Sequence, residues 1–273
     1  MENVAGSSEL IHKISEQKYE LFSLQLKNKI SDVIDLHIFK NDLVCTFVKQ
    51  LAGEIFFEEI QSMLGLLNEV EVGVVALDVP HISLFAQEEN VVFGVAVVIG
   101  VFNNIGTSNL DPINQLPFMI HTASYSNEQQ LEFKGLEKFT PQMKLGFHND
   151  GLLSPDKIEI PEYIVVYNLY LSYRKPGNFM WVPTALWEER EKYELLAKEE
   201  NVRIKIKLNP NYHVDATGDI VNTITNYVEV PISQLNKKRE QRFFLNGQVL
   251  PDNNSQKHVE FVQNIRDSLE KIL

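Results

Sequence analysis

The chain has 273 residues, of which 44% are hydrophobic, and a formal net charge of −12. This length fits one large domain or two small ones, and the apolar content is enough for a sizeable core. The acidic charge disfavours nucleic-acid binding, because phosphate backbones repel it, and the single cysteine excludes an intramolecular disulfide. The acidity suits a cationic small substrate, although its effect on solubility also explains it.

The start of the chain and its apolar runs bear on location. Residues 1–10 are polar and lack the basic and apolar regions of a signal peptide. The longest apolar run, near residues 91–102, is too short to span a bilayer. A single cysteine also fits a reducing compartment. We therefore expect a cytoplasmic protein without a membrane partner.

Helical spacing of apolar residues dominates the first hundred positions. Residues 8–33 predict one helix, and residues 43–67 predict a second helical stretch that is broken near Gly53. The apolar run 72–77, closed by an Asp-Val-Pro sequence, is typical of a short buried strand. Residues 91–103 predict another helix.

From about residue 117 the pattern favours strands. Residues 163–173 give the strongest prediction, because they are long, β-branched and aromatic. The other predicted strands are 117–123, 142–148 and 202–208, and helices are predicted at 184–201 and 258–273. Helices first and strands later indicate an α+β fold in a single domain, 1–273. Residues 1–110 would form a mainly helical cover, and residues 111–273 a sheet sandwich or jelly-roll core.

A His-x-acid pair is the main chemical signal. Residues two apart in a strand point to the same face, so such a pair can give two ligands to one metal. A third ligand, usually His, completes the 2-His-1-carboxylate set of non-haem iron oxygenases. With 7 His and 37 acidic residues, roughly one match is expected by chance. The sequence holds three: His148-Asn149-Asp150, His213-Val214-Asp215 and His258-Val259-Glu260.

Local context separates the three pairs. His148 and Asp150 stand where a predicted strand ends and a glycine follows, so we interpret them as metal ligands; a coincidental strand end is the alternative. His213 follows an Asn-Pro-Asn sequence and is predicted to lie in a loop. His258 and Glu260 begin a predicted helix, where residues two apart point about 200° from each other. Cys45, in an apolar helical run, is predicted to be a core residue and not a nucleophile.

Residues 144–151, Lys-Leu-Gly-Phe-His-Asn-Asp-Gly, carry a family resemblance. Together with the order of the surrounding segments they resemble the clavaminate-synthase-like branch of the iron(II)/2-oxoglutarate oxygenases, which neighbours the taurine dioxygenase group. The similarity is greatest to the arginine and asparagine hydroxylases of peptide-antibiotic biosynthesis. The other segments in the same order are 54–79, 91–105, 163–173, 188–199, 202–208 and 258–273.

The resemblance implies a fold and an activity. The fold is a double-stranded β-helix, or jelly roll, with a helical N-terminal cover. The activity is hydroxylation of an unactivated C–H bond in an amino acid or amino-acid-like metabolite such as arginine, lysine or asparagine. Iron(II), held by His148 and Asp150, and 2-oxoglutarate as cosubstrate are implied with it. Asp150 argues against halogenation, because a halide needs that coordination position left open.

Two departures from the family pattern keep alternatives open. Members often have Gly-Gly-x-Thr after the core strand, whereas Met180 stands at the Thr position here. The distal His and the arginine that pairs with 2-oxoglutarate normally follow a helix like 258–273, so the last core strand is expected to be missing. Compact members place the distal His earlier. On that spacing His213 is the third ligand, and Arg239 or Arg242 is the carboxylate partner.

Two other classes of protein fit the same observations. One is a catalytically inactive or truncated oxygenase-fold protein that acts as a binding or partner protein. A missing strand would expose a sheet edge, and self-association would cover it, which predicts a homodimer. The other is an unrelated α+β protein without a metal.

Overall fold

The computed structural model describes residues 10–30, 35–69, 72–111, 115–118, 152–153, 158–159, 161–168, 181–207, 212–214, 220–222, 227–235, 241–243, 245 and 254–272. The chain forms two compact units. The first, the helical unit, comprises residues 1–122 and 165–183. The second unit comprises residues 123–164 and 184–273.

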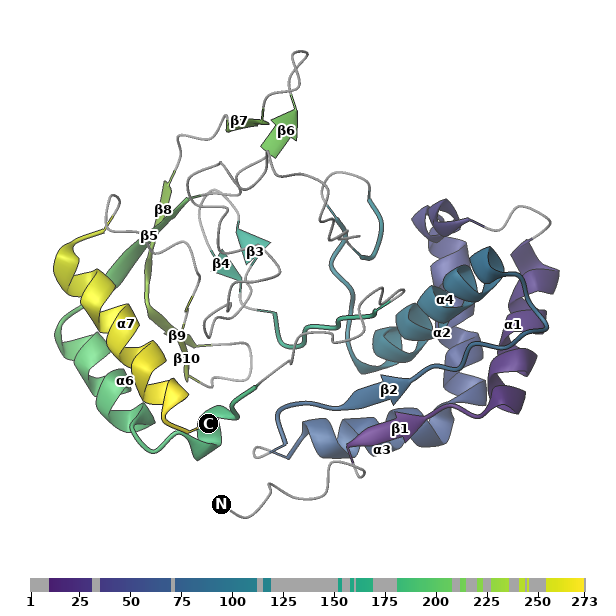
Figure 1. Cartoon of the computed structure of the whole chain (residues 1–273), viewed down its shortest axis with the longest axis horizontal. Coiled ribbons are helices and arrows are strands. Elements are labelled where there is room, and N and C mark those ends of the chain that lie inside the picture. The colour runs from purple at the N-terminus through teal and green to yellow at the C-terminus, as the bar shows by residue number, and fades with distance from the viewer. Residues whose placement is uncertain are drawn as a thin grey trace. The chain divides into compact units, whose positions relative to one another are not determined.

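Four α-helices, one 3₁₀ helix and a pair of short strands are the regular elements in the described part of the helical unit (Figure 1). They are β1 (Ile11–Lys13), α1 (Glu16–Ile30), the 3₁₀ helix η1 (Leu36–Lys40), α2 (Asp42–Ile55), α3 (Phe57–Leu67), β2 (Ala76–Asp78) and α4 (Gln87–Ile105). β1 and β2 run parallel, with Ile11 opposite Ala76 and Lys13 opposite Asp78. Asn41 caps α2, because its side chain accepts a hydrogen bond from the Leu43 N–H.

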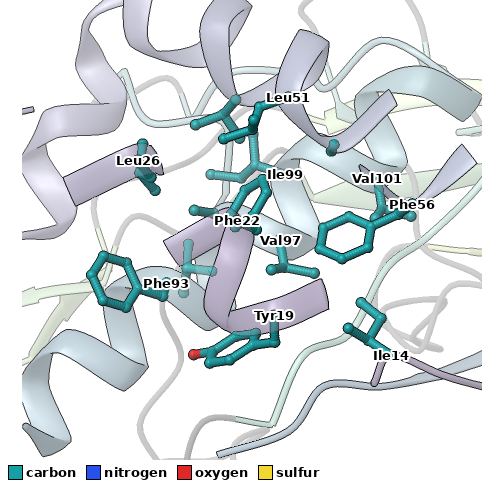
Figure 2. Close-up of a cluster of buried hydrophobic side chains, with 14 of the residues drawn as sticks. Ile14, Tyr19, Phe22, Leu26, Leu51, Phe56, Phe93, Val97, Ile99 and Val101 are labelled. Carbon is teal, nitrogen blue, oxygen red and sulfur yellow. The ribbon is translucent and has the colours of Figure 1, made fainter. Parts of the chain in front are cut away.

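The core of the helical unit is aromatic and aliphatic. Helix α1 directs Tyr19, Phe22 and Leu26 inward at helical spacing, and all three are fully buried. Figure 2 shows these side chains gathered with Phe56 and Phe93, which come from the end of α2 and from α4. The Phe22 and Phe56 rings lie 5.2 Å apart between centroids. Burial of this kind is the main source of stability for a helical unit.

Helices α2 and α4 cross at Gly100. A Cβ at that position would lie 2.6 Å from the Cβ of Ala52 and 2.8 Å from the carbonyl oxygen of Val48. The crossing is further fixed by Asn104, whose Nδ2 donates to the carbonyl of Lys49 at 2.8 Å. The absence of a side chain at Gly100 therefore permits the close approach of the two helices.

Helix α4 is more apolar than a surface helix. In the described part of the chain it is long and apolar enough, by length and composition, to cross a membrane. It is also the central helix of a packed core, and 56% of its apolar stretch is buried. The apolar run at 91–102 is thus part of a longer helix. The burial of this helix in the core explains why its composition is so apolar.

The second unit combines two helices with short antiparallel strand pairs. Its elements are β3 (Leu152–Leu153), β4 (Ile158–Glu159), η3 (Thr184–Leu186), α6 (Arg190–Glu199), β5 (Arg203–Lys207), β6 (Tyr212–Val214), β7 (Ile220–Asn222), β8 (Tyr227–Pro231), β9 (Ser233–Leu235), β10 (Gln241–Phe243) and α7 (Gln256–Glu270). β3 pairs with β4, β5 with β8, β6 with β7 and β9 with β10.

An aromatic cluster ties α6, α7 and β10 together. The Trp187 ring stacks on the Tyr193 ring with centroids 5.4 Å apart. The Phe243 and Trp187 rings lie edge to face with centroids 5.5 Å apart. Tyr193 in turn contacts Phe261 edge to face at 5.8 Å. The Trp187 indole N–H donates to the Ser268 hydroxyl at 2.8 Å, so the polar atom of a buried ring is satisfied.

Several sequence predictions are confirmed and others need correction. The helices predicted at 91–103 and 258–273 and the strand at 202–208 are present as α4, α7 and β5. The helix predicted at 8–33 begins only at Glu16, because β1 precedes it. The second helical stretch is interrupted at Phe56 and not at Gly53, which stays within α2.

The remaining element predictions have mixed outcomes. The buried strand predicted at 72–77 is present as β2, which starts later, at Ala76, and is not buried, since Ala76 and Asp78 are exposed. The helix predicted at 184–201 is present as η3 followed by α6. Residues 163–168 are not in a strand, and the rest of 163–173 lies outside the described residues, as do 142–148 and most of 117–123. The jelly roll, which needs larger sheets than these pairs, remains a prediction, as does the single domain.

Candidate metal site

The three predicted ligands have different places relative to the described structure. His148 and Asp150 lie outside the described residues. His213 lies in β6, where its backbone is opposite Val221 of β7. The prediction of a loop at His213 is therefore wrong. The Asn-Pro-Asn sequence that suggested a loop comes before the strand, and His213 lies within the strand. A strand fixes the backbone of a ligand more firmly than a loop does.

The third His-x-acid pair lies on a helix, as predicted. His258 is in the first turn of α7, and its N–H donates to the hydroxyl of the N-cap residue Ser255 at 3.2 Å. The Glu260 carboxylate accepts a hydrogen bond from the Gln256 side chain at 2.9 Å, one turn away. Residues two apart on a helix diverge, so His258 and Glu260 are not a shared ligand pair.

Of the residues predicted to lie near 2-oxoglutarate, two are outside the described residues and one is within them. Arg239 and Met180 lie outside the described residues. Arg242 is the middle residue of β10 and is opposite Gln234 in β9. Arg242 and His213 both belong to the second unit. Across the described residues no group of three or more His, Cys, Asp or Glu side chains is arranged to hold a metal ion.

Cys45 fits its predicted structural role. Its side chain packs against the core of the helical unit, and its thiol donates to the carbonyl of Phe39 at 3.2 Å. Burial raises the pKa of the Cys45 thiol, and the nearby Asp42 carboxylate adds to the shift. Both effects disfavour the thiolate, which is the reactive form.

Asn90 is a buried residue whose role no sequence motif indicates. Its Nδ2 donates to the carbonyls of Ile82, Phe85 and Ala86 at 3.0–3.1 Å, and its Oδ1 accepts from the Ile82 N–H at 3.2 Å. The Tyr19 hydroxyl donates to the Asn90 carbonyl at 3.2 Å. Because the amide is fully used in closing the turn before α4, its role is structural. The sequence feature that could have indicated this role is the position of Asn90 at the start of the apolar run.

The second unit holds a polar chain that the sequence also did not reveal. The Ser268 hydroxyl accepts a hydrogen bond from the Trp187 indole N–H and donates one to the Glu189 carboxylate. The Glu189 carboxylate also accepts a hydrogen bond from the Lys192 ammonium at 2.6 Å. The hydrogen bonds from Lys192 and then from Ser268 hold the pKa of Glu189 below its ordinary value. These hydrogen bonds join η3 and α6 to α7. The sequence feature that could have indicated them is a serine among the buried positions of α7.

A groove of about 490 Å³ lies along α6 in the second unit. Its lining includes Glu191, Glu194 and Lys198 of α6 and Ser233 of β9. None of the residues that line it is a predicted metal or cosubstrate residue.

Comparison with protein-family models and with curated proteins gives no match to this sequence. An assignment of function therefore depends on the residues of this chain.

Proposed function

We propose that this protein is an iron(II)/2-oxoglutarate-dependent dioxygenase that hydroxylates an amino acid or an amino-acid-like metabolite. The observation that carries the proposal is the sequence at 144–151, where His148 and Asp150 close a predicted strand and a glycine follows. Ligands at a strand end are braced by the strand and accessible from the turn.

The donor set has the chemistry that iron(II) requires. Two imidazoles, from His148 and His213, and one carboxylate, from Asp150, make a 2-His-1-carboxylate set with coordination positions left for other ligands. The helical position of His258 supports this choice, because it removes the competing pair. The strand position of His213 also supports it, because pairing with β7 fixes the backbone that bears the third ligand.

The cosubstrate requires a cation in addition to the metal. The far carboxylate of 2-oxoglutarate binds best to a guanidinium, which offers two parallel N–H donors. Arg239 and Arg242 are the candidates in this chain. When bound, iron(II) and 2-oxoglutarate supply the oxidative chemistry, and the protein residues orient the substrate and exclude water.

The net charge of −12 supports a cationic substrate, since an acidic protein attracts positively charged small molecules. Arginine and lysine are the first substrates to examine, and asparagine is the neutral comparison.

The test is an anaerobic titration of the apo protein with iron(II) and 2-oxoglutarate, in which the visible charge-transfer band of the chelated cosubstrate is recorded. The wild-type protein is expected to show the band. His148→Ala, Asp150→Ala and His213→Ala are each expected to weaken metal binding at least about tenfold. His258→Ala is the matched control, because that imidazole lies in the first turn of α7, and the band should persist.

The variants separate the parts of the proposal. Loss of the band in His148→Ala but not in His213→Ala would show that another residue is the third ligand. A wild-type protein that binds iron(II) but produces no succinate with any of a broad panel of amino acids would contradict the proposed activity.

The alternative is an oxygenase-fold protein that binds a partner and does not catalyse. Met180, which stands where family members often have Thr, favours this alternative. This alternative predicts no charge-transfer band and a homodimer that covers an exposed strand edge. Light scattering tests it, and a monomer would contradict the dimer.

A further inference from the structure

One face of helix α6 forms a wall of the groove of about 490 Å³ in the second unit. Glu191, Glu194, Leu195 and Lys198 line the groove, and the last three follow the first by three, four and seven positions. Residues at these spacings lie on the same side of a helix. These four residues, the α6 face, therefore form one continuous surface along two turns of the helix.

The middle of the α6 face is apolar and open to solvent. Leu195 is 56% exposed, although the lining of the groove also includes two buried apolar residues, Ala197 and Val202. These two are at most 5% exposed, so they already belong to the packed interior. A partner that covered Leu195 would remove its apolar surface from water, which is favourable.

The two ends of the α6 face carry opposite charges. Glu191 is in the first turn of α6 and Lys198 is in the last turn, and both residues are exposed. Neither makes an ion pair with another residue in the described part of the chain, whereas Glu194 is paired with Arg190 at 2.6 Å. The two unpaired charges are seven positions apart, or about 10 Å along the helix axis, with Leu195 between them.

This order of groups is complementary to itself. When two copies of α6 lie antiparallel across a two-fold axis near Leu195, Glu191 of each copy meets Lys198 of the other. The two Leu195 side chains then lie together at the centre. The Glu194 carboxylates also come near each other, and each is compensated by Arg190 of its own chain. A second copy of this chain therefore matches the face in charge as well as in apolar contact.

We propose that the α6 face is a docking surface for the same face of a second copy, which joins two chains in a symmetric homodimer. Helix α6 has 10 residues and is about 15 Å long, so the contact is smaller than a standard stable interface. The association is accordingly weak and depends on protein concentration. The proposal goes beyond the proposed function and does not depend on it, because no predicted metal or cosubstrate residue belongs to the α6 face.

The test exchanges charges between two chains. Sedimentation equilibrium of the full chain, from micromolar to millimolar concentration, is measured for the wild type, for Glu191→Lys, for Lys198→Glu and for an equal mixture of these two variants. Glu188→Lys is the matched control, because it makes the same charge change at an exposed residue of the second unit that does not line the groove. Circular dichroism of each variant verifies that the helices are retained.

The wild type is expected to dimerise as its concentration rises. In Glu191→Lys two positive charges meet at each end of the helix pair, and in Lys198→Glu two negative charges meet, so each variant alone should raise the dissociation constant at least about tenfold. In the mixture opposite charges meet again, and the mixed dimer should form with a dissociation constant within about threefold of that of the wild type. Net charge alone predicts otherwise: Glu191→Lys reduces the negative charge of −12 by two and would dimerise more strongly than the wild type.

Each other outcome overturns the docking surface. A wild type that stays monomeric up to millimolar concentration does so. Charge variants that dimerise as strongly as the wild type do so too, and they indicate an interface elsewhere, such as an exposed strand edge. The helix dipole favours the same order of charges within one chain but predicts no association on mixing, so variants that stay apart when mixed also overturn the proposal.

Leu195→Ser gives a second test if a charge variant fails to fold. It removes the central apolar contact from an exposed position and should raise the dissociation constant of the dimer at least about threefold. An unchanged dissociation constant in Leu195→Ser overturns the proposal.

Discussion

The helical unit and the second unit bury their aromatic side chains in different ways. In the helical unit Phe22 and Phe93 are fully buried among aliphatic residues, and α4 supplies apolar side chains in several directions. In the second unit the aromatic cluster around Trp187 is tied to a polar chain through Ser268 and Glu189. Apart from the hydrogen bond between Tyr19 and Asn90, packing therefore holds the buried aromatic side chains of the helical unit in place. In the second unit the hydrogen bond from Trp187 to Ser268 adds to the packing of the aromatic cluster.

The largest expected effect comes from removing one core ring in each unit. Phe22→Ala and Phe261→Ala should each cost about 3–5 kcal/mol of unfolding free energy, because each leaves a cavity. The two tryptophans, Trp181 in the helical unit and Trp187 in the second unit, report the two transitions separately when the other is replaced by Phe. We expect urea unfolding of Phe22→Ala to shift the Trp181 signal, and that of Phe261→Ala to shift the Trp187 signal.

This pair of variants also tests the number of domains. The sequence predicts one domain, which would unfold as a single cooperative transition. If both variants shift both tryptophan signals equally, the two units unfold together, and the separation into two independently stable parts is wrong.

Local periodicity predicted the elements whose burial is local. Helices α4 and α7 and strand β5 follow from apolar spacing alone. The pairing of β1 with β2 could not be predicted in this way, since its partners are about 65 residues apart and both strands are short. Gly53 was interpreted as a helix break, but the helix continues through it, and a Cβ there would lie 3.2 Å from Oδ1 of Asn104.

The candidate site shows the same limit. The chemical pattern of His148 and Asp150 is visible in the sequence because it is a contiguous motif. The secondary structure at His213 was predicted wrongly, since an Asn-Pro-Asn sequence is a strong turn signal that outweighs a strand of three residues. The hydrogen bonds that connect Trp187, Ser268 and Glu189 join residues about 80 positions apart, and no local sequence pattern indicates them.

A smaller effect is expected at the crossing of α2 and α4. Gly100→Ala should destabilise the helical unit by about 1–3 kcal/mol, because the added methyl group meets the Val48 carbonyl and the Ala52 side chain. Gly65→Ala, which meets no atom within 4 Å, should instead be neutral or stabilise α3 by up to about 1 kcal/mol. Thermal unfolding followed by circular dichroism compares them. Equal effects of the two variants would mean that α2 and α4 adjust to the extra atom at no cost.

The smallest expected effect is on the acid stability of each unit, and it depends on one carboxylate in each. In the helical unit the hydrogen bond from Lys27, and next the one from the Ala86 N–H, hold the pKa of Glu89 below its ordinary value. In the second unit the hydrogen bonds from Lys192 and Ser268 do the same for the pKa of Glu189. A carboxylate whose pKa is lower in the folded protein contributes stability above its unfolded pKa, and this contribution is lost as the pH falls through the folded pKa.

The pH series therefore has a defined window and sign. The urea midpoint should fall as the pH drops below about 4.3, the ordinary pKa of glutamate, toward the lower folded values. Glu189→Gln should flatten that fall in the Trp187 signal and leave it in the Trp181 signal, whereas Glu89→Gln should do the reverse. Both carboxylates are ionised in folded and unfolded protein at neutral pH, so each substitution lowers the midpoint there by removing the ion pair. A Glu189→Gln protein whose Trp187 signal kept the full acid dependence would show that other carboxylates control the second unit.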